Sequence, residues 1–587
     1  MHACRIAISV SLTLAIFLVT TGCSSAPDTP KEEAGRSAWT AGAMATAANP
    51  HAVEAAMAML RAGGHAVDAA IAAHAVLGLV EPQSSGLGGG AFMLVYERED
   101  GQMVFHDGRE IAPAGATVDM FMRDGKVMGF LDAWQSGKSI GVPGVVALYE
   151  DTHRRYGKLP WASLFQPAID LAREGFVVSP RMANFLPRVA ELGRLDENPG
   201  AADYFYPDGV PLQAGQHLQN PEYADTLTRI AREGSSAFYS GEIARAIAEQ
   251  AQAGPEPGTL TVEDIAAYRT RERKVLCRPF RDNRVCAPVA PSSATAQLMM
   301  LSLYDAFTDQ NSDRNTQLRA MVDAQRLAYA DRDHYYGDPD FVSVPLQPLL
   351  APDYLRQRAA QRFAPDALPR HGNPFAAGQQ AAQQLLWGAD TTEEVAGTSH
   401  LSIVDAEGNA VSMTATVEAP FGSGRWVAGF LLNNEMTDFA REYTPGEAPQ
   451  ANAVAPRKRP RSSMSPIIVF DAKDELRMVT GSPGGNSIPA YVFKSLVAVL
   501  DWNMTPQEAA DYPNIVARGK DVRVEVSVAP GQEIADLLEQ AGYSVQQREG
   551  ENSGLHLIVV ADGQLSGAAD SRREGTVGTL PAPQQAR

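Results

Sequence analysis

The chain has 587 residues, of which 45% are hydrophobic and 20% are charged, and its formal net charge is −19. This composition is that of an ordinary globular protein with enough length for a large core. The negative charge repels phosphates and anionic lipid surfaces, which argues against a nucleic-acid-binding or membrane-surface protein. Beyond the N-terminal segment no run of about 18 apolar residues occurs, so the sequence predicts no transmembrane helix there.

The first 23 residues have the pattern of an export signal. Arg5 supplies the positive start, Ile6–Val19 is a short apolar stretch, and small residues lead up to Cys23. The apolar stretch is too short for a stable membrane span. The sequence around Cys23 is typical of a bacterial lipoprotein processing site, with ordinary signal cleavage as the alternative. We therefore expect an exported, periplasmic protein, anchored to a bacterial envelope membrane if Cys23 is lipidated.

Two further cysteines, Cys277 and Cys286, lie in β-like runs joined by a short turn at 281–283. An exported compartment permits a disulfide between them, and two buried free thiols are the alternative, because the geometry decides. No C-x-x-C or H-E-x-x-H spacing occurs in the sequence. The sequence therefore predicts no metal site, and nothing in it calls for a cofactor.

The first half of the chain has mainly helical patterns. Asn49-Pro50 is typical of a helix N-cap followed by a first-turn proline, and it predicts a helix over 51–62. Residues 66–79 are apolar nearly all round, which predicts a buried helix. Further helices are expected within 151–267 and over 317–336. Residues 363–390 are rich in Ala, Gln, Gly and Pro and predict a mobile linker.

After this linker the pattern changes to hairpins. Strands are expected over 400–404 and 410–417, around a turn at 405–409, and again over 466–470 and 476–480. Helices are expected over 490–500 and 506–511. Hairpins with flanking helices in both halves predict an α+β fold, in which sheets pack between helix layers.

A candidate nucleophile lies between the linker and the first of these strands, in Gly397-Thr398. A threonine hydroxyl needs a base beside it, and the residue's own α-amine can be that base once the preceding peptide bond is cut. Gly397 leaves the carbonyl before Thr398 unshielded. Alone, the pair is typical of an ordinary strand start.

Other segments offer groups that recognise charge. Arg109 has the planar donor fork that suits a carboxylate. Glu435 and Asp438 are acids suited to an ammonium group, and Ser462-Ser463 offers hydroxyl donors. The glycine pair Gly484-Gly485 ends a strand, where two backbone amides can face a developing oxyanion. The glycine run 86–90 follows a predicted helix and lacks G-K-[ST], so it predicts close backbone packing rather than a nucleotide site.

Together these segments resemble the γ-glutamyltranspeptidase family, also called glutathione hydrolases. The resemblance covers residues 42–575 and is carried by many motifs in the same order. They include Gly64-His65-Ala66-Val67-Asp68, Glu81-Pro82-Gln83-Ser84-Ser85-Gly86, Asp107-Gly108-Arg109-Glu110, Thr398-Ser399-His400, Asn433-Asn434-Glu435-Met436, Arg461-Ser462-Ser463-Met464 and Gly481-Ser482-Pro483-Gly484-Gly485.

The resemblance implies an N-terminal-nucleophile hydrolase, built as a four-layer αββα sandwich. It implies that the precursor cuts itself at Gly397–Thr398 into a large subunit, 24–397, and a small subunit, 398–587, which stay together as a heterodimer. Thr398 is then expected to attack the γ-glutamyl amide of glutathione or a related compound. Water, an amino acid or a dipeptide resolves the acyl-enzyme.

The resemblance also assigns roles to the surrounding residues. Thr416 positions Thr398, and the amides of Gly484 and Gly485 meet the oxyanion. Two clamps of opposite charge hold the glutamyl group, so that its distant amide reaches the nucleophile. The carboxylate clamp is Arg109, Ser462 and Ser463, and the ammonium clamp is Glu435 and Asp438.

Two departures from the family pattern stand out. Ser399 replaces the commoner threonine, and Glu418 replaces an asparagine that faces the substrate carboxylate in many members. An acid at Glu418 repels a carboxylate unless it turns toward the ammonium. A cephalosporin or glutaryl acylase of the same fold, a poly-γ-glutamate-processing enzyme and a non-catalytic surface lipoprotein are the alternatives; the retained ammonium clamp favours a γ-glutamyl substrate over a glutaryl one.

Overall fold

The computed structural model describes residues 39–254, 256–375, 387–388, 390, 392, 394–395 and 397–582. The predicted signal with Cys23 lies outside the described residues, as does most of the predicted linker after residue 375. No helix among the described residues is both long and apolar enough to cross a membrane.

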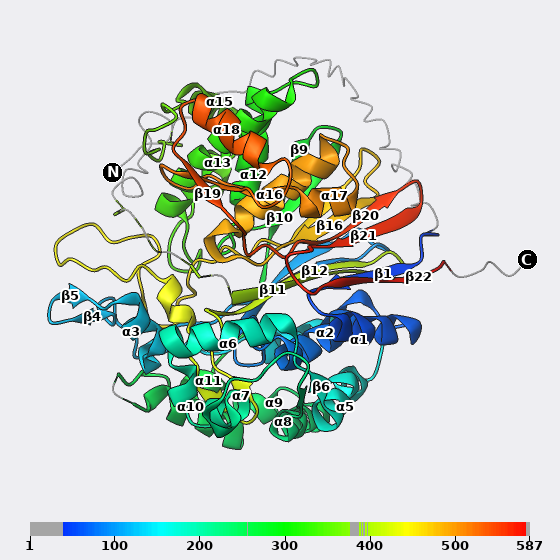
Figure 1. Cartoon of the computed structure of the whole chain (residues 1–587), viewed down its shortest axis with the longest axis vertical. Helices are drawn as coiled ribbons and strands as arrows, with labels where there is room; N and C mark the ends of the chain where they lie inside the picture. The colour runs from blue at the N-terminus through cyan, green and yellow to red at the C-terminus, as the bar shows by residue number, and fades with distance from the viewer. Residues whose placement is uncertain are drawn as a thin grey trace, which may run out of the picture. The chain divides into compact units, whose positions relative to one another are not determined.

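Two antiparallel sheets lie face to face in the middle of the fold (Figure 1). The seven-stranded sheet has the order β22 (Thr576–Leu580), β1 (Ala43–Ala47), β11 (Gly397–Val404), β12 (Ala410–Glu418), β2 (Gly90–Tyr96), β3 (Met103–Gly108) and β8 (Arg271–Arg273). The six-stranded sheet has the order β21 (Gln564–Ala569), β20 (His556–Ala561), β16 (Leu476–Gly481), β15 (Ile467–Phe470), β10 (Asn283–Pro288) and β9 (Val275–Phe280).

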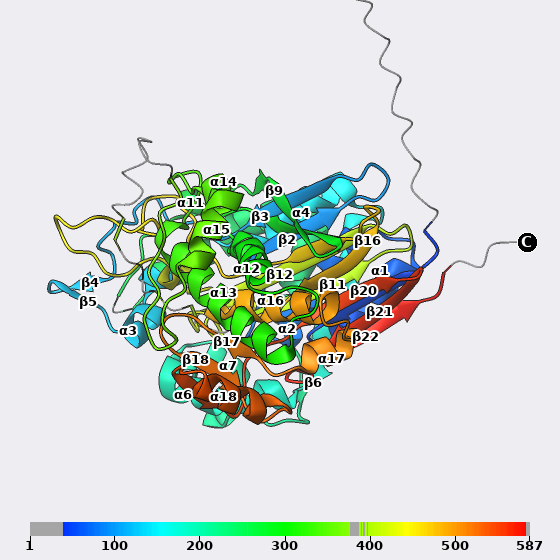
Figure 2. The same ribbon diagram turned by 90° about the horizontal axis from the view of Figure 1, so that it is seen from above.

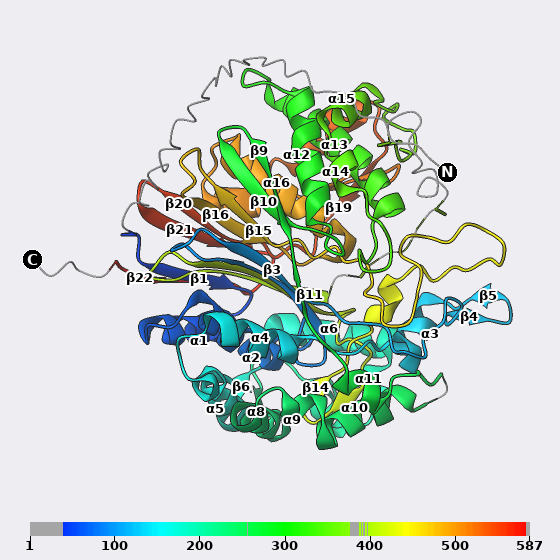
Figure 3. The same ribbon diagram turned by 180° about the vertical axis from the view of Figure 1, so that it is seen from behind.

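Helices cover the outer face of each sheet, as the views from above and behind also show (Figures 2 and 3). On the seven-stranded side lie α1 (Pro50–Arg61), α2 (Ala66–Val80), α3 (Phe130–Gln135), α4 (Val145–Tyr156), α5 (Gln166–Glu174), α6 (Pro180–Gly193), α7 (Ala201–Phe205), α8 (Pro221–Glu233), α9 (Ser236–Tyr239), α10 (Gly241–Gln252) and α11 (Val262–Ala266). On the six-stranded side lie α12 (Ala294–Phe307), α13 (Arg314–Tyr335), α14 (Leu346–Leu349), α15 (Pro352–Ala360), α16 (Ile488–Leu500), α17 (Pro506–Asp511) and α18 (Gly531–Gln540). The predicted four-layer αββα arrangement is confirmed.

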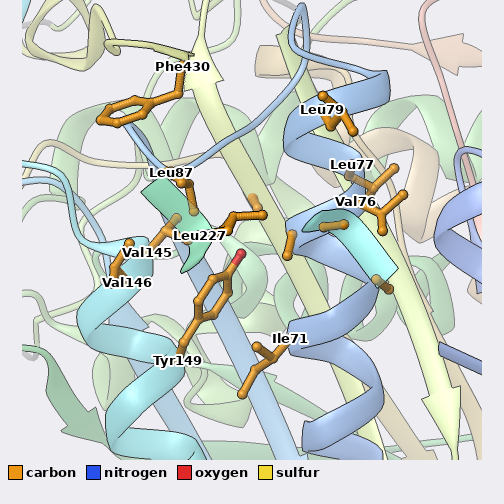
Figure 4. Close-up of a cluster of buried hydrophobic side chains, with 14 of the residues drawn as sticks. Ile71, Val76, Leu77, Leu79, Leu87, Val145, Val146, Tyr149, Leu227 and Phe430 are labelled. Carbon is orange, nitrogen blue, oxygen red and sulfur yellow. The ribbon is translucent and has the colours of Figure 1, made fainter. Parts of the chain in front are cut away.

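Strand alternation divides the side chains of β11 between two environments. Leu401 and Ile403 pack into the apolar cluster under α2 and α4, part of which Figure 4 shows. Thr398, His400 and Ser402 point the other way, and the Ser402 hydroxyl donates to the backbone oxygen of His556 on β20 at 2.8 Å. The predicted nucleophile therefore lies on the face of its sheet that meets the second sheet.

Most of the expected elements appear close to their predicted bounds. Asn49 caps α1, because its side chain accepts a hydrogen bond from the His51 amide. Both predicted hairpins form, as β11–β12 and β15–β16. The turn before β10 also forms, and a disulfide joins Cys277 to Cys286 between β9 and β10.

The expectation of a mobile linker over 363–390 is wrong for residues 363–375, the longest described part of that segment. The Gly372 amide donates to Asp331 Oδ1 at 2.7 Å, and Arg326 donates to the Ala364 carbonyl at 3.1 Å. These contacts attach the segment to α13. Its Ala and Pro content suggested freedom because the sequence did not reveal that buried side chains of a distant helix satisfy its backbone groups.

Candidate functional site

Thr398 lies at the start of β11, paired with Thr416 on β12. The Thr398 hydroxyl donates to Thr416 Oγ1 at 3.2 Å, and the Thr416 hydroxyl donates to the Gly397 carbonyl oxygen at 2.7 Å. The Glu418 amide in turn donates to Thr416 Oγ1 at 2.8 Å. Thr416 therefore contacts both the hydroxyl of Thr398 and the carbonyl of the peptide bond before it.

Gly397 has no room for a side chain. A Cβ at this position would lie 2.3 Å from the backbone oxygen of Glu418. The strand register also shifts between Gly397 and Thr398. The glycine thus lets the two strands approach closely at the candidate cleavage bond.

Arg573 is a site residue that sequence reasoning missed. Its guanidinium donates to the Thr398 carbonyl at 2.8 Å and to the Ser553 carbonyl at 3.2 Å. Burial lowers the pKa of Arg573 to about 9. A tandem arginine, Arg572-Arg573, is the one signal in the sequence, and it did not indicate which partner either side chain takes.

Arg109 follows β3 and is buried among carboxylates. It ion-pairs with Glu435 Oε1 and, at 2.5 Å, with Asp438 Oδ2, while Glu110 Oε2 lies 3.8 Å away. The two acids lie on a single 3₁₀ turn, Glu435–Asp438, where residues three apart share one side. The two clamps that the sequence predicted are therefore in direct contact with each other.

This cluster holds more acids than its one cation neutralises. Glu435 Oε2 and Asp438 Oδ1 are buried and accept no hydrogen bond from any described group. Burial raises the pKa of Asp438 well above its ordinary value, and repulsion from Glu394 and Glu435 adds to the shift. Burial likewise raises the pKa of Glu110 to about 7, against the opposing effect of Arg109. A further positive charge at this place is therefore favourable.

Glu418, the departure from the family pattern, is fixed in place beside this cluster. Its Oε1 accepts from the Val395 amide at 3.0 Å, and its Oε2 accepts from the Asn434 side chain. Burial raises the pKa of Glu418 well above its ordinary value, and repulsion from Asp438 acts in the same direction. Protonation is thereby favoured, and a neutral Glu418 does not repel a nearby carboxylate.

The two residues of the serine pair, Ser462 and Ser463, lie in different surroundings. Ser462 lines the cavity beside Thr398, and its Oγ accepts from the Met464 amide at 3.2 Å. The Ser463 hydroxyl instead accepts from Arg332 Nη2 at 2.7 Å, and its amide donates to Glu394 Oε2 at 2.8 Å. Sequence reasoning missed both Arg332 and Glu394, because each finds its partner only across the fold.

The glycine pair Gly484-Gly485 lies beside the Thr398 cavity. Gly484 and Gly485 have φ values of 136° and 56°, in the region that L side chains rarely adopt. Gly485 faces the Thr398 cavity, and Gly484 lines the adjoining one. A Cβ on Gly485 would lie 2.4 Å from the Glu394 carbonyl oxygen, so the turn packs against the segment before the candidate cleavage bond.

One small cavity gathers most of the predicted residues. Its volume is about 10 Å³, which suffices for roughly one water molecule. Three residues predicted to act around Thr398 do not line it: Gly397, Ser463 and Gly484. The lining consists of Arg109, Glu394, Val395, Thr398, Thr416, Glu418, Glu435, Asp438, Ser462, Met464, Gly485 and Ile488. Among the described residues, no three His, Cys, Asp or Glu side chains are grouped so as to hold a metal ion.

Comparison with known proteins decides the family. The family model described as gamma-glutamyltranspeptidase matches residues 52–580. The chain belongs to the gamma-glutamyltranspeptidase family. It is 36% identical over 528 residues to the glutathione hydrolase proenzyme of Escherichia coli K12, covering 88% of this chain and 87% of that one. To the glutathione hydrolase proenzyme of Bacillus subtilis 168 it is 33% identical, covering 91% and 90%.

Solved structures agree with this fold. The crystal structure of a cephalosporin acylase from Bacillus halodurans superposes with a TM-score of 0.80 at 25% identity, covering 96% of this chain and 100% of that one. The gamma-glutamyltranspeptidase family and this acylase thus share one architecture. The choice between their substrates has to come from the groups around Thr398.

Proposed function

We propose that the protein is a self-cleaving γ-glutamyl-transferring and glutathione-hydrolysing enzyme with Thr398 as its nucleophile. Thr398 Oγ1 forms an ester bond with the γ-carbonyl carbon, and the amide C–N bond breaks. The hydroxyl proton passes through the Thr398 α-amine to the leaving amine. Water or an acceptor amine then attacks the ester, which releases glutamate or a new γ-glutamyl amide and restores the hydroxyl.

The charge balance around Arg109 is the observation that carries this proposal. A γ-glutamyl group ends in a carboxylate and an ammonium on the same carbon atom. Arg109 lies in direct contact with Glu435 and Asp438, so the site offers both signs of charge side by side. The acids also outnumber the cation, and two of their oxygens accept no hydrogen bond from the described residues. A substrate ammonium supplies the missing positive charge.

Self-cleavage at Gly397–Thr398 into 24–397 and 398–587 is part of the proposal. Three features support it: the Thr398 hydroxyl and the Gly397 carbonyl share one partner in Thr416, Gly397 allows close strand approach, and the cavity has room for about one water. A glutamyl group does not fit beside the uncut segment, which includes Glu394 and Val395. Cleavage therefore precedes turnover, because it frees both the α-amine and this segment's chain end.

Export is proposed as well, with the segment that leads up to Cys23 as the signal and with Cys23, retained at the start of the mature chain, as the lipid site. Replacing Cys23 by serine is expected to move the protein from the membrane fraction to the soluble periplasmic fraction. Retention of the variant in the membrane fraction contradicts lipid anchoring at Cys23 and leaves the enzymatic proposal untouched.

The ammonium group of the substrate distinguishes a γ-glutamyl enzyme from the acylase alternative. We expect Asp438→Asn to lower kcat/KM for γ-glutamyl-p-nitroanilide about a hundredfold, since a buried charged contact is lost, while glutaryl-p-nitroanilide hydrolysis changes by less than about threefold. Asp119→Asn, an exposed aspartate, is the matched control. Equal losses on the two substrates, or a wild-type preference for the glutaryl compound, favour the acylase.

A further inference from the structure

The disulfide between Cys277 and Cys286 lies beside a cavity that the Thr398 chemistry does not use. The volume of this cavity is about 330 Å³, within the usual range for small-molecule pockets. Met103 of β3 lines it from the seven-stranded sheet, and Cys277 of β9 lines it from the six-stranded sheet. The cavity therefore lies between the two sheets, and it shares no lining residue with the Thr398 cavity.

The disulfide joins two residues that lie directly opposite each other in a hairpin at the edge of a sheet. Strand β9 is the last strand of the six-stranded sheet, and Cys277 is paired with Cys286 of β10 in the strand register. Cys277 is partly exposed and lines the cavity, whereas Cys286 is fully buried and does not line it. A molecule that enters the cavity therefore reaches the sulfur of Cys277 and not that of Cys286.

The hairpin does not depend on the disulfide for its shape. Backbone pairing between β9 and β10 runs from Asn283 opposite Phe280 to Pro288 opposite Val275, and so continues on both sides of the disulfide. Strand β10 also pairs with β15 along its other edge. The disulfide closes only a short loop, so it removes little conformational freedom from a hairpin that these pairs already fix. The bond can therefore open without unfolding the sheet.

Arg284 places a positive charge beside both sulfur atoms. It lies two residues before Cys286 on β10, so the two side chains share one face of the sheet. Its Nη1 lies 3.4 Å from Cys277 Sγ and 3.2 Å from Cys286 Sγ. An ion pair with Asp474 at 2.9 Å and the ring of Phe470, whose centroid is 4.4 Å away, hold the guanidinium there. A nearby cation favours the thiolate form of a cysteine, so Arg284 stabilises the sulfur that is released when the disulfide opens.

The lining of this cavity is positively charged, although the whole chain carries a net charge of −19. Lys274 and Arg284 are its charged residues, and no acid lines it. Asp474 partly offsets the charge of Arg284. Lys274 is exposed, and no carboxylate of the described residues lies within ion-pair distance of its ammonium group. The cavity therefore favours a small molecule that carries a carboxylate over one that carries a positive charge.

We infer that the Cys277–Cys286 disulfide is a site of thiol–disulfide exchange, and that its cavity admits small thiols that carry a carboxylate. The incoming thiolate attacks Cys277 Sγ and forms a mixed disulfide, while the bond between the two cysteines breaks and its electron pair passes to Cys286 Sγ. Arg284 stabilises this new thiolate, and Lys274 attracts the carboxylate of the thiol. Return attack by Cys286 on Cys277 Sγ expels the thiol and restores the disulfide. The exchange goes beyond the proposed function and does not depend on Thr398.

The test exposes the folded protein to three small thiols of different charge: 3-mercaptopropionate, 2-mercaptoethanol and cysteamine. Iodoacetamide then alkylates the free thiols, and peptide mass mapping follows both cysteines. Each rate of opening is divided by the rate of the same thiol with a small neutral disulfide, which removes differences in intrinsic reactivity. We expect the thiol on Cys277 and the alkyl group on Cys286, with opening about tenfold faster for 3-mercaptopropionate than for cysteamine. None of the three is a γ-glutamyl compound, so the proposed activity of Thr398 does not consume them.

Three variants separate the two cations. Lys274→Gln is expected to lower the rate ratio between 3-mercaptopropionate and cysteamine about threefold. Lys126→Gln, an exposed lysine of β5 (Lys126–Val127) that does not line the cavity, is the matched control and should leave the ratio unchanged. Arg284→Gln should slow opening by all three thiols about tenfold, because the released thiolate loses its cation, and Arg284→Lys should restore most of the rate.

A disulfide that stays closed with all three thiols until the protein is denatured overturns the inference. A thiol that maps to Cys286, or an opening rate that depends neither on the charge of the thiol nor on Lys274, overturns it as well. Each of these results leaves the proposed function untouched, because the reaction of Thr398 is not part of the measurement.

Discussion

Arg109 and Asp333 are the centres of two buried clusters with opposite excess charge. In the first, one cation faces several acids; in the second, one acid faces several cations. The first cluster contains Arg109, Glu110, Glu435 and Asp438, and the second contains Asp333, Arg332, Arg461 and Arg518. Both adjoin the segment that precedes Thr398.

The two clusters shift the pKa of an aspartate in opposite directions. Burial alone would raise the pKa of Asp333, but Arg518, Arg332 and Arg461 together lower it to about 2. Burial raises the pKa of Asp438, and neighbouring acids raise it further, against the effect of Arg109. The number of opposite charges nearby, rather than burial, therefore decides which of the two acids stays ionised.

The difference in excess charge matters because the two clusters are suited to partners of opposite charge. In the uncut chain the arginine-rich cluster binds acids of the segment before Thr398: Arg332 pairs with Glu394 at 2.6 Å and Arg461 with Asp390 at 2.8 Å. Among the described residues of that segment, none pairs with the acid-rich cluster in this way. One cluster thus holds the precursor segment, and the other is suited to an incoming ammonium.

Removing the cation of the acid-rich cluster should have the largest effect. We expect Arg109→Gln to lower kcat/KM for γ-glutamyl-p-nitroanilide by about a thousandfold, because loss of one partner leaves buried carboxyls without their cation and removes the contact to the substrate carboxylate. Arg123→Gln, at an exposed ion pair, is the control and should change activity less than about twofold. A loss below tenfold in a protein that still cleaves itself contradicts the assigned role.

Removing an anion that the arginine-rich cluster binds should slow self-cleavage but not the turnover of substrate. We expect Glu394→Gln to slow self-cleavage about tenfold, since Arg332 loses a buried partner that fixes the segment before Gly397. Once cleaved, the variant should turn over substrate within about twofold of the wild type. A gel time course followed by an activity assay measures both, with Glu407→Gln, an exposed acid, as control. Unchanged self-cleavage, or a loss of turnover as large as the loss of cleavage, contradicts the different roles assigned to the two clusters.

The smallest expected effect is on pH dependence. Because the pKa values of Asp438 and Glu435 are raised, these carboxyls stay protonated at pH values where ordinary ones, with pKa near 4, are ionised. Protonated carboxyls attract an ammonium weakly, so KM for a γ-glutamyl substrate should fall severalfold as the pH rises above the range in which ordinary carboxyls ionise. The KM of Asp438→Asn should vary less with pH. A flat wild-type profile, or one that rises with pH, contradicts the cluster's electrostatics.

The sequence predicted the layers and the acid-rich cluster better than the arginine-rich one. Alternating strands, helix caps and glycine turns are local signals, and the family motifs contain Arg109, Glu435 and Asp438. Arg332 and Arg573 lie in ordinary helical and loop patterns, and their partners are distant in sequence. The protonated state favoured for Glu418 was equally hidden, because it depends on burial and on neighbours that only the fold brings together.

Thr398 is proposed to become a chain end and then to act as the nucleophile. Sequencing the N-terminus of the smaller fragment, together with the intact masses of both fragments, tests it most directly. We expect two fragments that remain associated, with Thr398 as the first residue of the smaller one, and a single inactive chain for Thr398→Ala. An active uncut chain, or a small fragment beginning at any other residue, contradicts it.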